Sequence, residues 1–204
     1  LLGEVAYDEA IKEEDPDKQK EKCNTAIRVC EESIRQFLLV CSYYWVCYMS
    51  SSLIESYLIA SGLETTVEGK RALFMKAIEV GKDGLKYAQY LLHWGMVELY
   101  YSLSKAFYFL SEMETSVSEK RKLLQEALEL RERDIKLVHK LTAPHAWMRG
   151  VSQNYLALIK AEMAKIEEDE AKKRQLLEEA ISGMEECLQT CTRWFQSLGN
   201  PEVS

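Results

Sequence analysis

The stretch Glu119–Leu128 reads EKRKLLQEAL, and similar phrases occur at 69–78 as GKRALFMKAI and at 172–181 as KKRQLLEEAI. Aligning the three phrases on their alanine reveals a fourth, weaker copy earlier in the chain. The aligned alanines, which we call the register alanines, are Ala26, Ala77, Ala127 and Ala180, at separations of 51, 50 and 53 residues. A phrase that returns at a fixed period predicts an array of similar supersecondary units.

Apolar residues recur at fixed offsets from each register alanine, four and three residues before it and one and eight residues after it. In the third copy these positions hold Leu123, Leu124, Leu128 and Ile135. The offsets trace one stripe on a helix of 3.6 residues per turn, and the small alanine in the stripe allows another helix to approach closely.

A residue able to cap a helix stands eleven positions before each register alanine. These residues are Asp15, Thr66, Ser116 and Asp169. Pro16 follows the first cap, where proline suits the first helical position, and Glu119 completes a capping box with Ser116. We therefore predict long helices that begin at Pro16, Val67, Val117 and Glu170.

A second, more apolar helix fills the space before each following cap. Trp45, Trp94 and Trp147 lie 21, 22 and 22 residues before the next cap, inside these second helices. Each unit is therefore a helix of about 22–26 residues, a short corner and a helix of about 20 residues. We place the corners at Cys41–Ser42, Leu92–His93 and, by its proline, Thr142–Pro144.

The composition fits an all-α chain, with only three Pro and nine Gly among 204 residues and 47% hydrophobic residues. We predict seven to eight helices, arranged as stacked antiparallel hairpins in one domain, residues 1–204. The parts are the end of a preceding hairpin (1–14), three repeats (16–64, 67–114 and 117–167) and a half repeat (170–198).

On these residues the sequence resembles tetratricopeptide-type helical repeats in the broad sense. The usual unit of about 34 residues has its Trp near the start of the first helix, whereas here the period is longer and the Trp residues open the second helix. The resemblance implies a right-handed α-solenoid that binds peptides or proteins. Because the chain starts with Leu in mid-hairpin and stops after a half unit, we expect a segment of a longer protein or a product that lacks residues at its N-terminus.

Charge and hydropathy exclude several classes of partner. Acidic and basic residues, 33 and 26 in number, are mixed along the chain for a net charge of −7, so we expect no nucleic-acid partner. No apolar run reaches the length of a membrane span, and no signal-peptide pattern opens the chain. We expect a cytoplasmic protein with no membrane partner.

No nucleotide-binding, metalloprotease, hydrolase or calcium-loop motif occurs in the sequence, so we expect no enzymatic activity and no cofactor. Cys187 and Cys191 are spaced as a metal or redox pair, but we interpret all six cysteines as reduced core thiols. His139 and His145, with Cys41 or Asp134, form an alternative metal set, which we interpret as polar residues at a turn.

A cation pair recurs near the start of three of the long helices. The pairs are Lys70-Arg71, Lys120-Arg121 and Lys173-Arg174, with Gln19-Lys20 as a weaker copy. Cations at this end of a helix gain nothing from the helix dipole. They either pair with acidic residues that close the preceding helix (Glu13-Glu14, Glu64, Glu112 and Glu114, Glu167-Glu168) or line up as a basic ladder for an acidic partner.

Aromatic residues of the second helices offer another candidate surface. Trp94, Tyr101 and Trp147 either line an apolar peptide groove or belong to the core.

Three functions remain open from the sequence. The first is a non-enzymatic scaffold that binds a protein or peptide within a larger regulatory or signalling protein. The second is a sensor segment that binds a small molecule or signal peptide and controls an attached effector. The third is self-assembly into homo-oligomers through exposed solenoid ends.

Overall fold

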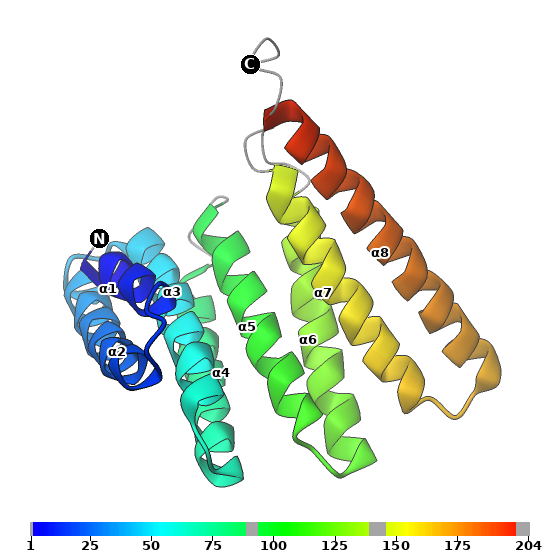
Figure 1. Ribbon diagram of the computed structural model, residues 1–204, viewed down its shortest axis with the longest axis horizontal. Helices are drawn as coiled ribbons and strands as arrows, with labels where there is room; N and C mark the ends of the chain where they lie inside the picture. The colour runs from blue at the N-terminus through cyan, green and yellow to red at the C-terminus, as the bar shows by residue number, and fades with distance from the viewer. Residues whose placement is uncertain (1, 89–93, 139–145, 199–204) are drawn as a thin grey trace. The chain divides into compact units, whose positions relative to one another are not determined.

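The computed structural model describes residues 2–88, 94–138 and 146–198, and it places eight helices in this part of the chain (Figure 1). They are α1 (Leu2–Ile11), α2 (Pro16–Leu39), α3 (Tyr43–Leu63), α4 (Val67–Ala88), α5 (Trp94–Glu112), α6 (Val117–Val138), α7 (Ala146–Lys165) and α8 (Glu170–Leu198). No strand occurs among these residues, so the predicted all-α class with seven to eight helices is confirmed.

The four long helices begin where their caps predict. Asp169 Oδ1, for example, accepts hydrogen bonds from the amides of Ala171 and Lys172 at 2.9 and 3.1 Å. The other capping oxygens belong to Asp15, Thr66 and Ser116, and each accepts an amide of its own first turn. A cap needs only a local sequence, which is why these boundaries follow from the sequence alone.

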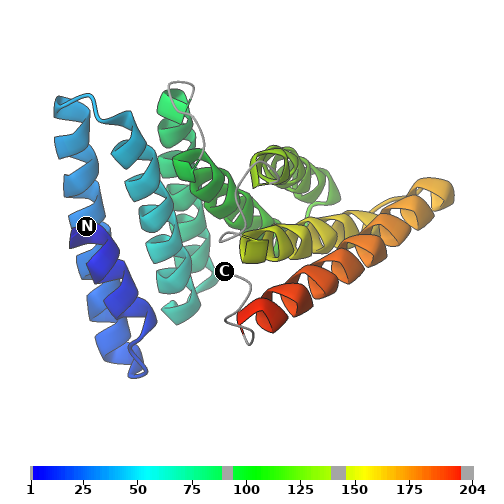
Figure 2. The same ribbon diagram turned by 90° about the horizontal axis from the view of Figure 1, so that it is seen from above.

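The chain divides into two compact units, Leu1–Met113 with α1–α5 and Glu114–Ser204 with α6–α8. Inside each unit every helix packs against its neighbours in sequence, as the side-by-side ribbons of Figure 2 show. In the first unit α3 also contacts α1 and α5, so these three helices form one layer. The predicted stack of antiparallel hairpins is thus confirmed within each unit, and the prediction of a single domain stays a prediction.

The register alanines are buried, which explains why the stripe is centred on a small residue. A close approach between helices lies one turn further along α4. A Cβ atom built on Gly81 would lie 2.5 Å from Leu103 Cδ1 of α5 and 3.1 Å from Ile54 Cδ1 of α3. In the first unit, the long helix α2 packs against α1 and α3, and the long helix α4 packs against α3 and α5.

The corner between α2 and α3 lies at Cys41–Ser42, as predicted. Cys41 has φ of 51°, and the amides of Cys41 and Ser42 donate to the carbonyls of Leu38 and Phe37 at 3.2 and 2.9 Å. This is the pattern of a Schellman helix end. The predicted corners Leu92–His93 and Thr142–Pro144 lie outside the described residues.

All six cysteines are free thiols. Cys23, Cys30 and Cys47 are buried, as predicted for core thiols. The prediction is wrong for Cys41, which is exposed because it occupies the helix-ending turn. It is also wrong for Cys187 and Cys191, which are only half-buried, at the edge of the contact between α8 and α7.

No helix within the described ranges has both the length and the apolar composition that crossing a membrane requires.

Candidate functional site

The predicted cation pairs occupy the fourth and fifth positions of α4, α6 and α8. Their side chains differ in exposure. Lys70 is half-buried and Arg71 is exposed, whereas Lys120 and Arg121 are both half-buried. In α8, Lys173 is half-buried and the Arg174 side chain is 83% exposed. The three pairs are therefore not equivalent surfaces.

In the second unit the cation pair of α6 joins the two ends of one hairpin. Lys120 Nζ lies 3.2 Å from Glu162 Oε2 near the end of α7. Arg121 Nη1 lies 2.9 Å from Glu167 Oε2, and Arg121 Nη2 donates to the Ile166 carbonyl at 2.7 Å. Glu162 also accepts from Lys165. These contacts give Lys120 and Arg121 a structural role.

Pairing between cations and carboxylates was predicted, but several of the predicted partners are wrong. Arg121 was expected to pair across the preceding corner, whereas it contacts Glu167 beyond the far end of its own hairpin. Lys173 and Arg174 contact Glu170 and Glu178 of their own helix. Antiparallel packing explains the first difference, because it brings the start of α6 beside the end of α7.

The first corner shows the predicted kind of pairing. Lys22 Nζ lies 2.6 Å from Glu13 Oε2, although the sequence pointed to Lys20 as the cation of this repeat.

The acidic residues before the corners include one at a fixed position, whose contact with the following cap the sequence did not predict. A glutamate stands two positions before each cap, and we call these residues the corner glutamates. They are Glu13, Glu64, Glu114 and Glu167. In three of them the carboxylate accepts the amide of the cap residue, at 3.3 Å for Asp15, 3.1 Å for Thr66 and 3.2 Å for Asp169. The fixed distance to the cap was the available signal.

Electrostatics link the corner glutamates to the cations. Backbone and hydroxyl hydrogen bonds from Thr66, the Thr65 amide and the charge of Lys20 hold the pKa of Glu64 below its usual value. The Asp169 amide and Arg121 lower the pKa of Glu167 in the same way. Lys20 and Arg121 both stand six residues before a register alanine. Lys20 and Arg121 therefore each act on the corner glutamate of their own hairpin. We call the direct contact of Arg121 with Glu167 the hairpin clamp.

One face of α8 leaves large apolar side chains in solvent. Leu177, Ile181, Met184 and Leu188 are 42, 60, 40 and 69% exposed, and we call them the α8 stripe. At the first two of these offsets, Phe74 and Ile78 of α4 and Leu124 of α6 are at most 8% exposed. At the last offset, Leu85 of α4 and Ile135 of α6 are half-buried.

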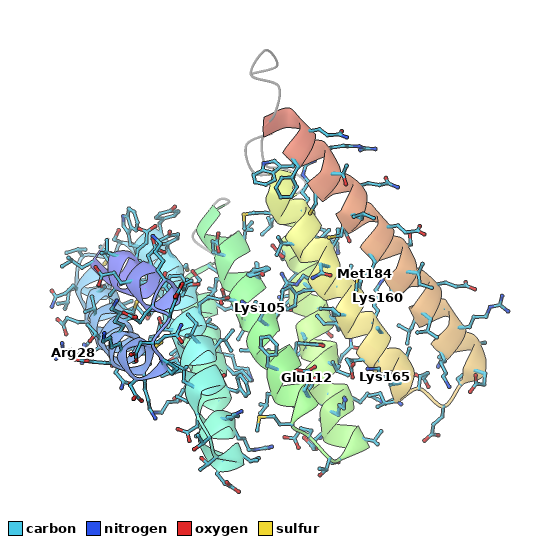
Figure 3. All side chains as sticks on the ribbon, viewed as in Figure 1. Arg28, Lys105, Glu112, Lys160, Lys165 and Met184 are labelled. Carbon is cyan, nitrogen blue, oxygen red and sulfur yellow. The ribbon has the colours of Figure 1, made fainter. Side chains whose placement is uncertain are left out.

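Another side of α8 packs against α7. A Cβ atom built on Gly183 would lie 3.4 Å from the Cβ of Ala157, and Lys160 Nζ lies 2.6 Å from Glu179 Oε2. Figure 3 labels Lys160 and Met184 where the two helices run side by side. The α8 stripe therefore lies on a side of α8 other than the one that packs against α7.

The predicted aromatic site is only partly described. The side chains of Trp94 and Trp147 lie outside the described residues. Tyr101 is half-buried, and Lys105 Nζ lies 5.3 Å from the centre of its ring. Several other aromatic residues of the second helices are buried, namely Tyr57, Tyr100, Phe107 and Tyr108. These residues belong to the core, which is the alternative that the sequence left open.

A shallow groove of about 470 Å³ lies between α2 and α4 in the first unit. Val46 and Leu53 of α3 form part of its floor, and its walls carry acidic and basic side chains on both sides. The charged residues are Glu31, Arg35, Asp83 and Lys86. Because the charges balance, the groove favours no charge class of ligand.

The alternative metal set is not assembled in the described structure. Asp134 is fully buried, and its Oδ2 accepts from Arg131 Nη1 at 2.8 Å and from Ser152 Oγ at 2.7 Å. His139 and His145 lie outside the described residues. Among the residues that the structure describes, no three acidic, histidine or cysteine side chains are placed to hold a metal ion.

No family model matches the sequence, and no curated protein matches it. Among solved structures, a chain described as "DHF58 filament" has 16% sequence identity and a TM-score of 0.46, over 95% of this chain and 94% of that chain. At that TM-score the likeness establishes neither a shared fold nor a shared function. The resemblance to tetratricopeptide-type repeats stays a prediction.

Proposed function

We propose that this chain is a non-enzymatic helical scaffold of the cytoplasm that binds a partner protein by taking up one of its helices on the α8 stripe. The observation that carries the proposal is the exposure of this stripe at offsets that are buried or half-buried in α4 and α6. Large apolar side chains in one row on a helix are the usual anchor for an amphipathic partner helix.

The other long helices indicate what kind of helix fits. Leu103 of α5 packs against Gly81 of α4, and Gly81 stands four residues after the register alanine. Met184 occupies the same offset in α8 and is 40% exposed. A partner helix with a leucine-rich face, running antiparallel to α8, reproduces this arrangement.

Arg174 adds a charge requirement to the partner. It stands six residues before its register alanine, as Arg121 does in α6, and its side chain is 83% exposed. Arg121 contacts a carboxylate just beyond the end of the helix that covers α6. We therefore expect the partner helix to end in an acidic corner that reaches Arg174.

Site-specific photocrosslinking tests the proposal. The photoreactive residue p-benzoylphenylalanine replaces Leu188 in the stripe, or Ser182 as the control, and crosslinked peptides from cell extract are identified by mass spectrometry. Ser182 is exposed and is one residue, or about 100° of helix rotation, from Ile181. We expect a crosslink from position 188 to an apolar helix with an acidic C-terminal end, and none from position 182.

Charge substitutions provide the second half of the test. Ile181→Glu and Leu188→Glu should abolish capture without lowering thermal stability, because both residues are exposed. Ser182→Glu should leave capture unchanged. Equal crosslinking from positions 182 and 188, or capture that survives Leu188→Glu, contradicts the proposal.

A second candidate function is head-to-tail self-association, which the surface of α1 favours. Leu2, Leu53 and Leu103 each stand eleven residues before a corner glutamate. Leu2 of α1 is 79% exposed, whereas Leu53 and Leu103 are at most 2% exposed. Val5 is exposed as well, and Glu13 supplies the corner carboxylate. α1 of one copy thus carries the features that the α8 stripe of another copy requires.

Sedimentation velocity over a range of concentrations separates the two candidates. Self-association predicts that Val5→Glu and Leu188→Glu are each monomeric, and that their mixture forms a heterodimer because each variant keeps one intact end. A wild-type chain that stays monomeric at every concentration rejects self-association and leaves the partner-helix proposal standing.

A further inference from the structure

A small pocket in the first unit has a strongly acidic lining. It has a volume of about 180 Å³ and is formed by residues of α1, α3 and α5, the three helices of one layer. The carboxylates in the lining are Glu4, Asp8, Glu55 and Glu98. We call it the acidic pocket, and it lies in a different unit from the α8 stripe.

One carboxylate of the acidic pocket forms an ion pair with a lysine. Lys105 Nζ, labelled in Figure 3 on α5, lies 2.6 Å from Glu55 Oε2. Within the described residues, the pocket lining itself contains no lysine or arginine. Four carboxylates around one small volume repel one another, and a cation placed between them relieves that repulsion.

The two tyrosines of the lining, Tyr7 and Tyr48, have raised pKa values in this negatively charged surrounding. Tyr48 donates a hydrogen bond to Glu4 Oε1 at 2.7 Å. Burial raises the pKa of Tyr48 and of Tyr7 well above the usual range, and the surrounding carboxylates raise both further. Both hydroxyls are therefore neutral, so they add hydrogen-bonding groups and no further negative charge.

Two buried polar atoms of the lining lack a partner in the structure. Ser102 is 1% exposed, and its Oγ makes no hydrogen bond. Glu55 Oε1 is also buried without a partner, although Oε2 of the same carboxylate binds Lys105. Buried polar atoms are nearly always hydrogen-bonded, and these two can both accept. A ligand that carries N–H donors satisfies both.

The arrangement favours an organic cation over a metal ion. No three acidic, histidine or cysteine groups of the described chain are placed to hold one metal ion. The carboxylates come from three different helices, α1, α3 and α5. A slender chain with an ammonium group at each end reaches separated carboxylates, and each ammonium offers three N–H donors.

We infer that the acidic pocket binds a short aliphatic diamine, with one ammonium group held by Glu55 and Ser102 and the other by the carboxylates of α1 and Glu98. This site goes beyond the proposed scaffold function and does not depend on it. Because the diamine contacts three helices at once, its binding stabilises their packing and gives the first unit the property of a small-molecule sensor.

Isothermal titration calorimetry of the whole chain with 1,4-diaminobutane tests the inference. We expect saturable binding with one site that weakens as salt is added. The neutral analogue 1,4-butanediol should not bind, and tetramethylammonium, which has no N–H donor, should bind more weakly than the diamine. Absence of saturable diamine binding, or equal binding of the diol, overturns the inference.

Substitutions in the lining locate the site. Asp8→Asn and Glu98→Gln should each weaken diamine binding by about tenfold or more, because each removes one carboxylate from an ion pair. Glu68→Gln, an exposed carboxylate of α4 in the same unit, is the matched control and should change nothing. Equal affinity in Glu98→Gln and the wild type contradicts the proposed site.

Ser102→Ala separates ligand binding from a structural role. Without diamine this variant should melt no lower than the wild type, because it removes a buried oxygen that has no partner. With saturating diamine its rise in melting temperature should be smaller than that of the wild type. If a lysine-containing peptide raises the melting temperature while the diamine does not, the site belongs to a protein partner and the diamine assignment is wrong.

Discussion

Arg121 and Glu167 connect the first turns of α6 to the corner that follows α7, with 2.9 Å between Nη1 and Oε2. Arg121 also donates to the Ile166 carbonyl, so one guanidinium holds both a side chain and the backbone at the end of α7. Glu167 in turn accepts the amide of Asp169, the cap of α8. The two residues thus join three helices of the second unit.

The first prediction concerns this hairpin clamp. Arg121→Lys keeps the charge but loses the second directed hydrogen bond, so it should lower the midpoint of chemical unfolding of the second unit. Arg121→Ala should lower it further. Lys122→Ala is the matched control, because Lys122 is exposed and pairs with its neighbour Glu119 on the same helix. Equal midpoints for Arg121→Ala and Lys122→Ala would contradict the clamp.

The clamp also predicts a dependence on pH. The pKa of Glu167 is below its usual value in the folded chain, because the Asp169 amide and Arg121 favour the carboxylate. The corresponding stability is present above the unfolded pKa and is lost as the pH falls through the folded pKa. Glu167→Gln should therefore be less stable than the wild type at neutral pH, and the difference should shrink in acid. Urea unfolding at several pH values measures it.

Sequence reasoning succeeded where the signal is local. The caps Asp15 and Asp169 and the register alanines need only neighbouring residues to be interpreted, and the helix boundaries follow from them. The partner of Arg121 required knowing which helix ends lie side by side, which the charge pattern alone does not give. The corner glutamates were visible in the sequence at a constant distance from the caps.

The acidic pocket shows a second limit of the sequence. Glu4 and Glu55 both stand nine residues before a corner glutamate, so the repeat places them at equivalent positions of α1 and α3. That they share one pocket with Glu98 depends on the layer that α1, α3 and α5 form. Packing between non-consecutive helices is a tertiary property, and no spacing within one helix predicts it.

The second prediction uses two glycines of the first unit. Gly81→Ala places a methyl group against Leu103 and Ile54, both fully buried, and should destabilise the unit by about 1–3 kcal/mol. Gly62→Ala is the matched control, because a Cβ there meets nothing within 4 Å. It should stabilise α3 by about 0.5–1 kcal/mol. Calorimetric unfolding of both variants checks the opposite signs, and two shifts of the same sign would refute this view of the packing.

The third prediction concerns the buried pair in the second unit. Arg131 and Asp134 are both fully buried, and Ser152 completes the cluster. Arg131→Met leaves a buried carboxylate without its cation, which should cost about 3–5 kcal/mol at neutral pH. The double variant Arg131→Met/Asp134→Leu should recover most of that loss, because neither charge then remains in the core. A double variant as unstable as Arg131→Met would contradict this account.

The same cluster has a pH signature opposite to that of Glu167. Burial raises the pKa of Asp134 above its usual value, against the lowering effects of Arg131 and Ser152. Between the unfolded and the folded pKa the folded state therefore binds more protons than the unfolded state, so this group's contribution to stability declines as the pH rises through the folded pKa. Removing Arg131 raises the pKa further. The deficit of Arg131→Met should accordingly be larger at pH about 8 than at pH about 5, whereas the double variant should show no such change.

The fourth prediction contrasts the cysteines. Cys41 is exposed in the turn after α2, whereas burial raises the pKa of Cys30 to about 12 and that of Cys47 to about 11. Since the thiolate is the reactive form, Ellman's reagent should modify Cys41 of the folded chain first. Cys41→Ser should remove this fast phase and leave the slow phases unchanged. A fast phase that persists in Cys41→Ser would show that another thiol reacts as readily as Cys41, which contradicts this ranking.

The backbone of Cys41 allows a companion test of the same turn. Its φ of 51° is in the left-handed region, where a side chain is disfavoured and glycine is not. Cys41→Gly should therefore be at least as stable as the wild type, whereas the β-branched Cys41→Val should be less stable by about 1–2 kcal/mol. Thermal unfolding of the two variants measures the difference. Equal stability of both would show that the turn relaxes out of this conformation, and the Schellman end of α2 would then not hold in solution.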